Sequence, residues 1–311
     1  MITIGITTCN RMKYTKSLLK SLGDEILLNN EVILVDNGSK EKGFKEFLEK
    51  ECKRLNIKFY NRSEKKRDWI NDEYIAKNII IENSTKDTIL FLQDDQQFLF
   101  DEKTLMHLAE SFGKVNIPSL DVNAVRKVTI EGNYLPNRIE IENNGIKEMF
   151  WLRRNNHFQT MGFFKKDVFE KCGLYPVDWP LEKVYWGRSE TWYANKIKEY
   201  NNKYLNHQIH NVKTHVPVFA CVWNDPRGGY AFIRGEKRWG HYLDPISETY
   251  YKNLTFEDYK VFLKNENRIP FSFTDIANPD GWEYNKNEIG DQVKFPQSQV
   301  MIDGPFKVIG D

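Results

Sequence analysis

Two adjacent carboxylates, Asp94 and Asp95, directly follow an apolar run at residues 88–92 that has the length and composition of a buried strand. Such a pair would repel itself unless a cation lay beside it. Carboxylate oxygens are the ligands that Mg²⁺ and Mn²⁺ prefer, and these ions also bind substrate phosphates. The alternative is a solvated turn after a strand, which an isolated acidic pair favours. Polar segments elsewhere in the chain shift the balance towards a metal site.

Two further polar segments follow apolar runs near the start of the chain. T7-T-C-N-R11 follows residues 2–6, and D36-N-G-S39 follows residues 32–35. Asp36 and Asn37 can form a turn that presents side-chain acceptors to a nucleobase. Taken alone, this segment is typical of an ordinary turn between elements.

The first hundred residues contain the elements that must position these side chains. Short β-type runs alternate with helical periods, and the helical period that starts near residue 14 is expected to stop at Gly23. This pattern predicts a parallel sheet covered by helices, in which ligands bind at the carboxyl ends of the strands. The predicted strands are residues 2–6, 32–35, 57–60 and 88–92, and the predicted helices are residues 14–22, 44–55 and 69–81.

The rest of the chain has a weaker pattern. We expect helices at residues 101–112, 166–171 and 187–200, and extended segments at residues 122–130 and 158–164. An alternating segment follows the last of these helices and continues to residue 218. The last ninety residues have no clear period and are rich in Tyr, Trp, Asn and Pro, so loops and short helices are expected. No repeat or linker is visible, which favours one large domain.

Composition excludes several classes of protein. The 311 residues include 45 Lys and Arg against 44 Asp and Glu, so any nucleic acid or anionic membrane must be held by a local patch. No apolar run approaches the roughly 20 residues of a membrane-spanning helix. The first residues lack the features of a secretory signal, which predicts a cytoplasmic protein. The four cysteines form no C-x-x-C pair, so neither a zinc site nor a disulfide framework is expected.

The order of the motifs resembles the family 2 nucleotide-diphospho-sugar glycosyltransferases. In that family the first strand ends in a T-x-x-N-R/K-like stretch and the second in V-D-[DN]-G-S. Residues 7–11 and 35–39 are similar. N61-R-S63, A76-K-N78 and F91-L-Q-D-D95 are similar to the family's N…A-x-N…F-L-D-D-D run at matching separation. Gln93 stands where the family often has its first Asp.

The resemblance covers roughly residues 1–218 and implies a GT-A fold. This is an α/β fold with a Rossmann-like mixed, mainly parallel sheet flanked by helices. Residues 1–100 would form the nucleotide-sugar donor half, residues 101–218 the acceptor half, and residues 219–311 an irregular C-terminal extension packed on the same domain. No G-x-G-T-R-type phosphate loop follows the first strand, unlike in the related nucleotidyltransferases.

The resemblance also implies the roles of residues in the donor half. Asp95 would bind the metal, and Asp94 the ribose of the donor. If the carbonyl oxygen of Asn37 accepts the imide hydrogen of uracil, UDP is the favoured nucleotide. The residues expected to bind the nucleotide base are Thr7, Asp36 and Asn37, with Arg11, Lys77 and Asn78 as weaker candidates.

In the second half, residues 160–175 resemble the segment that precedes the catalytic acid of the family. Ser189-Glu190 and Lys196 then correspond to the family's E-D-x-x-x-x-x-R. Glu190 would be the general base that takes the proton of an acceptor hydroxyl, and the alternative is a surface Glu on a helix. His215 falls at the place of a family histidine and is a candidate metal ligand, with His210 as its main competitor.

Residues 224–240 combine glycines with basic side chains that include Arg227 and Arg234. One interpretation is a lid that closes over the donor diphosphate and excludes water. A solvated loop is the other.

Together these features predict an inverting glycosyltransferase that depends on Mn²⁺ or Mg²⁺. It would transfer a sugar from a nucleoside-diphosphate donor to a hydroxyl acceptor, in surface glycan biosynthesis. Two alternatives remain open. One is transfer to a modified nucleic-acid base, with the basic cluster at residues 62–67 and the loop at residues 227–238 binding the phosphates. The other is a non-catalytic nucleotide-sugar-binding module in which the altered motifs mark decay.

Overall fold

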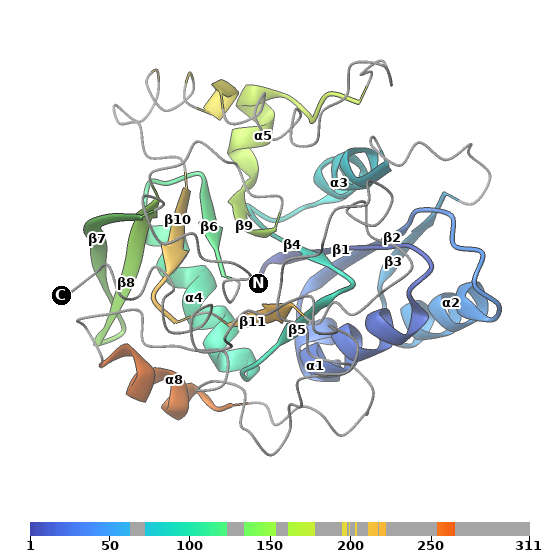
Figure 1. Cartoon of the computed structure of the whole chain (residues 1–311), viewed down its shortest axis with the longest axis horizontal. Coiled ribbons are helices and arrows are strands. Elements are labelled where there is room, and N and C mark those ends of the chain that lie inside the picture. The colour runs from blue at the N-terminus through green and yellow to red at the C-terminus, as the bar shows by residue number, and fades with distance from the viewer. Residues whose placement is uncertain are drawn as a thin grey trace, which may run out of the picture.

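The computed structural model describes residues 1–62, 72–122, 134–153, 161–177, 195–197, 199, 203, 211–216, 218–221 and 254–264. Its centre is a nine-stranded sheet in the order β3-β2-β1-β4-β9-β6-β10-β8-β7 (Figure 1). The strands of this sheet are β1 (Thr3–Thr8), β2 (Glu31–Asp36), β3 (Lys58–Asn61), β4 (Thr88–Gln93), β6 (Ser119–Asp121), β7 (Tyr134–Asn143), β8 (Ile146–Arg153), β9 (Gly162–Lys165) and β10 (Asn211–Thr214).

A small second sheet pairs β5 (Gln96–Phe98) with β11 (Phe219–Cys221) in antiparallel fashion. The described helices are α1 (Met12–Asn29), α2 (Phe44–Arg54), α3 (Asp72–Asn83), α4 (Glu102–Lys114), α5 (Lys166–Cys172) and α8 (Phe256–Leu263).

The sheet is mixed but mainly parallel, as the sequence predicts. The first four strands, β3, β2, β1 and β4, pair in parallel. The next strand, β9, is antiparallel to both β4 and β6, and β10 is again parallel to β6. Consequently the carboxyl ends of β1, β2, β4, β6 and β10 lie along one edge of the sheet, which we call the carboxyl edge.

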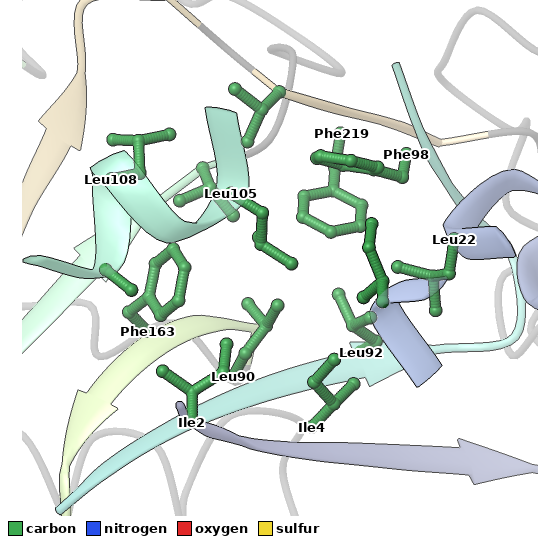
Figure 2. Packing of buried hydrophobic residues seen from close by; sticks show 14 of the residues in the cluster. Ile2, Ile4, Leu22, Leu90, Leu92, Phe98, Leu105, Leu108, Phe163 and Phe219 are labelled. Carbon is green, nitrogen blue, oxygen red and sulfur yellow. The ribbon is translucent and has the colours of Figure 1, made fainter. Parts of the chain in front are cut away.

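Helices cover both faces of the sheet. Because successive side chains of a strand point to opposite faces, each strand contributes to a core on either side. Leu90 and Leu92 of β4 pack with Leu22 of α1 and with Leu105 and Leu108 of α4 (Figure 2). On the other face, toward α3 and α5, a second cluster forms around other side chains of the same strands. Its members include Ile33, Val35, Ile80, Ile89, Phe91, Phe164 and Phe169. This two-sided burial explains why the strands are almost continuously apolar.

The larger cluster joins the two predicted halves of the chain. It runs from Ile2 and Val32 to Phe163 and Val212, and it also includes Tyr259 of α8. Part of the C-terminal extension therefore packs on the same core. The boundaries at residues 100 and 218 stay a prediction. Among the described residues, no helix is long and apolar enough to cross a membrane.

Candidate active site

The polar segments after β1, β2 and β4 meet at the carboxyl edge. Thr8 is paired with Asp36 of β2, and Thr7 with Gln93 of β4. Chain order reverses here, because β1 is followed by β2 on one side and has β4 on its other side. Such a switch point is where open α/β sheets bind ligands. The sequence therefore placed its three donor-side motifs together correctly.

Asp94 is fastened to the end of β1. Its backbone N–H donates to the Thr7 carbonyl oxygen at 3.1 Å. Its Oδ2 accepts hydrogen bonds from the Thr8 hydroxyl at 2.9 Å and from the Cys9 backbone N–H at 3.3 Å. Its Oδ1 accepts from Arg11 Nη1 at 3.0 Å. Both carboxylate oxygens of Asp94 thus already have donors within the protein.

Asp95 is buried beside Asp94, and the two share one cation. Arg11 Nη1 lies 3.0 Å from Asp94 Oδ1 and 3.7 Å from Asp95 Oδ2. Burial raises the pKa of the Asp94 carboxyl, Arg11 opposes this effect, and the neighbouring charge of Asp95 adds to it. A positive charge beside Asp94 and Asp95 therefore stabilises their ionised forms at this point of the carboxyl edge.

A divalent cation fits this pair through Asp95. Since the oxygens of Asp94 accept hydrogen bonds from β1 and Arg11, Asp95 is the better placed carboxylate to bind a metal. In the part of the chain that the structure describes, no three His, Cys, Asp or Glu side chains are grouped so that they could hold an ion. Mg²⁺ and Mn²⁺ suit such a site, because they bind through one or two carboxylates and complete their shell with phosphate and water oxygens.

The turn after β2 is held by its own side chains. Asp36 is fully buried, and its carboxylate accepts hydrogen bonds from the backbone N–H of Ser39, at 3.2 Å to each oxygen, and from the Ser39 hydroxyl. The backbone N–H of Asn37 donates to the Thr8 carbonyl oxygen at 2.9 Å. The side-chain oxygen Oδ1 of Asn37 accepts from Arg62 Nη1 at 2.6 Å. Asp36 shapes the turn, whereas half-buried Asn37 lies at its surface.

Comparison with known proteins agrees with this geometry. The sequence model of the family described as Glycosyl transferase family 2 matches residues 3–173, which is more than half of the chain. The chain belongs to this family. The resemblance noted in the sequence is therefore confirmed. No curated protein matches the chain by sequence.

Solved structures of GT-A glycosyltransferases are similar to this family 2 chain. Staphylococcus aureus TarS 1–349 in complex with UDP-GlcNAc is 15% identical, with a TM-score of 0.50 over 72% of this chain and 59% of that one. The mannosyltransferase PcManGT from Pyrobaculum calidifontis, in complex with GDP-Man and Mn²⁺, is 16% identical, with a TM-score of 0.47 over 75% of this chain and 59% of that one. The chain spans 36% of the length of TarS. The likeness to TarS 1–349 supports the GT-A fold.

In this family 2 chain, Lys77 of α3 is a buried side chain. Its Nζ lies 2.6 Å from Glu73 Oε1, and 5.7 Å and 5.9 Å from the ring centres of Tyr74 and Tyr175. The same Glu73 oxygen accepts a hydrogen bond from Gln93 Nε2 at 2.7 Å. Lys77 therefore reaches the acidic turn indirectly, through Glu73 and Gln93. Its contact with a donor stays a prediction.

Asn78, the next residue of α3, holds a backbone segment in place. Its Nδ2 donates to the Tyr175 carbonyl oxygen at 2.8 Å, and its Oδ1 accepts from the Tyr175 N–H at 2.9 Å. These two bonds tie α3 to the residues after α5. They give Asn78 a structural role, and its predicted nucleotide contact is not tested.

His215 follows β10 at the carboxyl edge and is fully buried. Its backbone N–H donates to the Met149 carbonyl oxygen at 3.0 Å. β9 and β6 lie between β4 and β10, so the two strands are about 14 Å apart at a spacing of about 4.8 Å. Only the loops beyond the strands can bring His215 and Asp95 to one ion, and this ligand stays a prediction.

Four predicted residues lie outside the described part of the chain: Glu190, His210, Arg227 and Arg234. Their roles as general base, alternative metal ligand and lid residues therefore stay predictions. The described residue Cys221, in β11, pairs with Gln96 of β5, directly after the acidic turn.

Sequence reasoning missed several side chains that build the site. Thr8 and Ser39 hold Asp94 and Asp36, and Glu73 holds both Gln93 and Lys77. Thr8 and Ser39 belong to motifs that the sequence analysis quoted, so their hydroxyls were a usable signal. Glu73 sits in no motif, and nothing in its spacing distinguishes it from a solvated helical glutamate.

Proposed function

We propose that this protein is an inverting, metal-dependent glycosyltransferase that uses a nucleoside-diphosphate sugar and a hydroxyl acceptor. The observation that carries the proposal is the buried pair Asp94–Asp95 at the switch point of the sheet, with Asp94 fixed to β1 and Arg11 beside both carboxylates. Membership of glycosyl transferase family 2 supports the same reaction class.

The chemistry follows from the charges that develop during transfer. The leaving diphosphate gains negative charge, and a divalent cation at Asp95 would supply electrostatic stabilisation. Asp94, held rigidly by Thr8 and Arg11, would position the ribose end of the donor. An acceptor hydroxyl is a weak nucleophile at neutral pH, so Glu190 would take its proton during attack. A single displacement of this kind inverts the anomeric centre.

The altered first position of the acidic motif is accommodated, which argues against decay of the site. Gln93 donates from its side chain to Glu73 at 2.7 Å, and its backbone N–H donates to Gln96 Oε1 at 2.8 Å. The turn that carries Asp94 and Asp95 is thus anchored on both sides. Both donor-binding carboxylates are therefore held in place despite the altered first position of the motif.

The donor and the acceptor are finer parts of the proposal. UDP is the nucleotide expected from the sequence, and S. aureus TarS 1–349 was solved with UDP-GlcNAc. A surface glycan is the expected acceptor. UDP-sugars are therefore the reference donors for a first assay, with the corresponding CDP- and GDP-sugars beside them.

The test is donor hydrolysis by the full chain with Mn²⁺, which needs no known acceptor. Release of nucleoside diphosphate should fall by about 100-fold or more in Asp95→Asn, because one charge is removed from the cation site. Asp24→Asn is the matched control, since Asp24 is an exposed carboxylate on α1 that pairs with Arg54. Equal hydrolysis by the two variants, or none by the wild type with any of the three donor classes, would refute the proposal.

A further inference from the structure

The side-chain amide of Asn37 has an orientation that chemistry determines. Arg62 Nη1 lies 2.6 Å from the Asn37 atom that faces it. A guanidinium group has five N–H donors and no acceptor, so that atom must be the amide oxygen. The usual ambiguity between the oxygen and the nitrogen of an asparagine does not arise here.

Arg62 is itself held in place from several sides. Its Nη1 lies 3.0 Å from Asp72 Oδ1 and donates to the Asp72 carbonyl oxygen at 3.1 Å. Its backbone N–H donates to the Asp36 carbonyl oxygen at 2.9 Å. Its side chain is only 7% exposed. The guanidinium is therefore a fixed part of the site, and it fixes Asn37 in turn.

The consequence is that Asn37 turns its NH₂ group away from Arg62. Asn37 is half-buried on the turn at the carboxyl edge, and within the described residues no hydrogen bond from its Nδ2 is found. An approaching ligand would meet a hydrogen-bond donor there. An aspartate at the same position would present a second acceptor oxygen instead.

We infer that Arg62 makes Asn37 a hydrogen-bond donor to the nucleobase, so that position 37 favours cytosine over uracil. The N3 atom of cytosine is an acceptor, whereas uracil carries a hydrogen on N3 that would face the NH₂ group of Asn37. The inference rests on the proposed function and revises the nucleotide expected from the sequence. That expectation required the Asn37 oxygen to accept the uracil N3 hydrogen, but this oxygen already accepts from Arg62.

Asn37 and Arg62 then have different tasks. Asn37 would touch the base, and Arg62 is a positioning residue that acts through Asn37. Asp36, another predicted base contact, has its carboxylate in hydrogen bonds with Ser39. It is Asn37 that presents a side chain to the ligand at this turn.

The test is calorimetric titration of the full chain with CDP and with UDP, both in the presence of Mn²⁺. For the wild type, the Kd of CDP should be no larger than that of UDP. In Asn37→Asp the ratio of the two affinities should move towards UDP by roughly 10-fold or more, because the half-buried NH₂ donor that faces the uracil N3 hydrogen is replaced by an acceptor. Asn144→Asp is the control for the added charge, since Asn144 lies in the exposed β7–β8 turn and its variant should keep the wild-type ratio.

The possible outcomes separate the inference from the proposed function. A wild type that prefers UDP, or an Asn37→Asp variant with the wild-type ratio, overturns the inference and leaves the glycosyltransferase proposal standing. The comparison of CDP with UDP on the wild type can overturn the inference even if the variant does not fold. Binding of neither nucleotide to the wild type overturns the inference, and hydrolysis of the GDP-sugar then decides the proposed function.

Discussion

Arg11 is the cation on which the acidic pair depends, and replacing it by methionine should destabilise the protein strongly. Asp94 and Asp95 are 3% and 4% exposed, and Arg11 Nη1 lies 3.0 Å and 3.7 Å from their oxygens. Removing one partner of a fully buried ion pair costs about 3–5 kcal/mol. Because the Arg11 side chain is 22% exposed, water compensates part of the lost charge, and we expect about 2–3 kcal/mol.

Urea unfolding at pH 7 measures this change, with Arg54→Met as the matched control. Arg54 also faces two carboxylates, Asp24 and Glu51, but lies on the surface, so its replacement should change the free energy of unfolding far less. The metal proposal adds a second expectation. Millimolar Mn²⁺ should raise the stability of Arg11→Met more than that of the wild type, because the ion replaces the missing charge.

Two results would refute this reasoning. If Arg11→Met and Arg54→Met had equal, small effects, the acidic pair would not need a nearby cation. If Mn²⁺ stabilised the wild type and Arg11→Met equally, Arg11 and the ion would not compete for the same charge.

Three further predictions concern the sheet. Lys213→Met should cost about 3–5 kcal/mol in urea unfolding, because it removes the ammonium group that lies 3.2 Å from the buried carboxylate of Asp121. Adding Asp121→Leu should recover most of this loss. Gly162→Ala should cost about 3 kcal/mol or more, because Gly162 has φ of 119° and an added Cβ would collide with a backbone carbonyl; Gly113→Ala, with open space in α4, should be neutral or slightly stabilising. Burial alone would raise the pKa of Glu31, but hydrogen bonds from Lys58, Thr3 and Thr85 lower it to about 2. Since the folded-state pKa lies below the ordinary value of 4.5, the stability that Glu31 provides is present above that pH and is lost as the pH falls towards 2, so Glu31→Gln and the wild type should converge over that interval.

Each of the three has a result that contradicts it. A double variant of Lys213 and Asp121 as unstable as the single one would mean that the loss comes from packing. Equal stability of the two alanine variants would remove the steric argument for Gly162. A constant difference between Glu31→Gln and the wild type from neutral to acidic pH would show that the carboxylate is not linked to proton binding.

Much of the donor half was predictable from the sequence because its strands are buried on both faces. Strands β1, β2, β3 and β4 lie within a residue or two of their predicted positions. Beyond the donor half, α4 and α5 match the predicted helices at residues 101–112 and 166–171. Continuous apolar runs of this length leave few alternatives to a parallel sheet. Polar segments at their carboxyl ends then had to meet.

The prediction that the first helical run stops at Gly23 is confirmed by the backbone of that residue. α1 spans Met12–Asn29, but Gly23 has φ of 74° and ψ of 158°, outside the helical range, so two helices meet there at a kink. The second helix, from the kink to Asn29, was not predicted. Its Ile26 and Leu27 are buried in the core, and the sequence alone gave no sign that the chain would resume a helix on the same core.

The acceptor half was harder because its pairing is antiparallel and long in range. The hairpin of β7 and β8 was not predicted, although Asn144-Gly145 supplies the two positive φ angles that a tight hairpin turn needs. The packing of α8 on the core was not predicted either. It depends on Tyr259, whose hydroxyl donates to the buried Glu148 at 2.8 Å across 111 residues of chain. Contacts of this separation leave no periodic trace in the sequence.

One row of residues across the sheet changes from apolar in the donor half to charged in the acceptor half. On the face toward α3 and α5, Ile33 and Phe91 are apolar, and Gly162 follows them at the first antiparallel strand. The next two strands place the fully buried pair Asp121 and Lys213 side by side in register. A buried ion pair stabilises a fold little better than apolar residues of the same volume, so stability does not explain why this face becomes charged beyond Gly162. The row lies just below the carboxyl edge, where β6 and β10 end two and three strands away from β4. We therefore expect the pair to orient the acceptor-side end of these strands, so that an apolar Asp121–Lys213 replacement would keep the fold and lose transfer to acceptor while keeping donor binding.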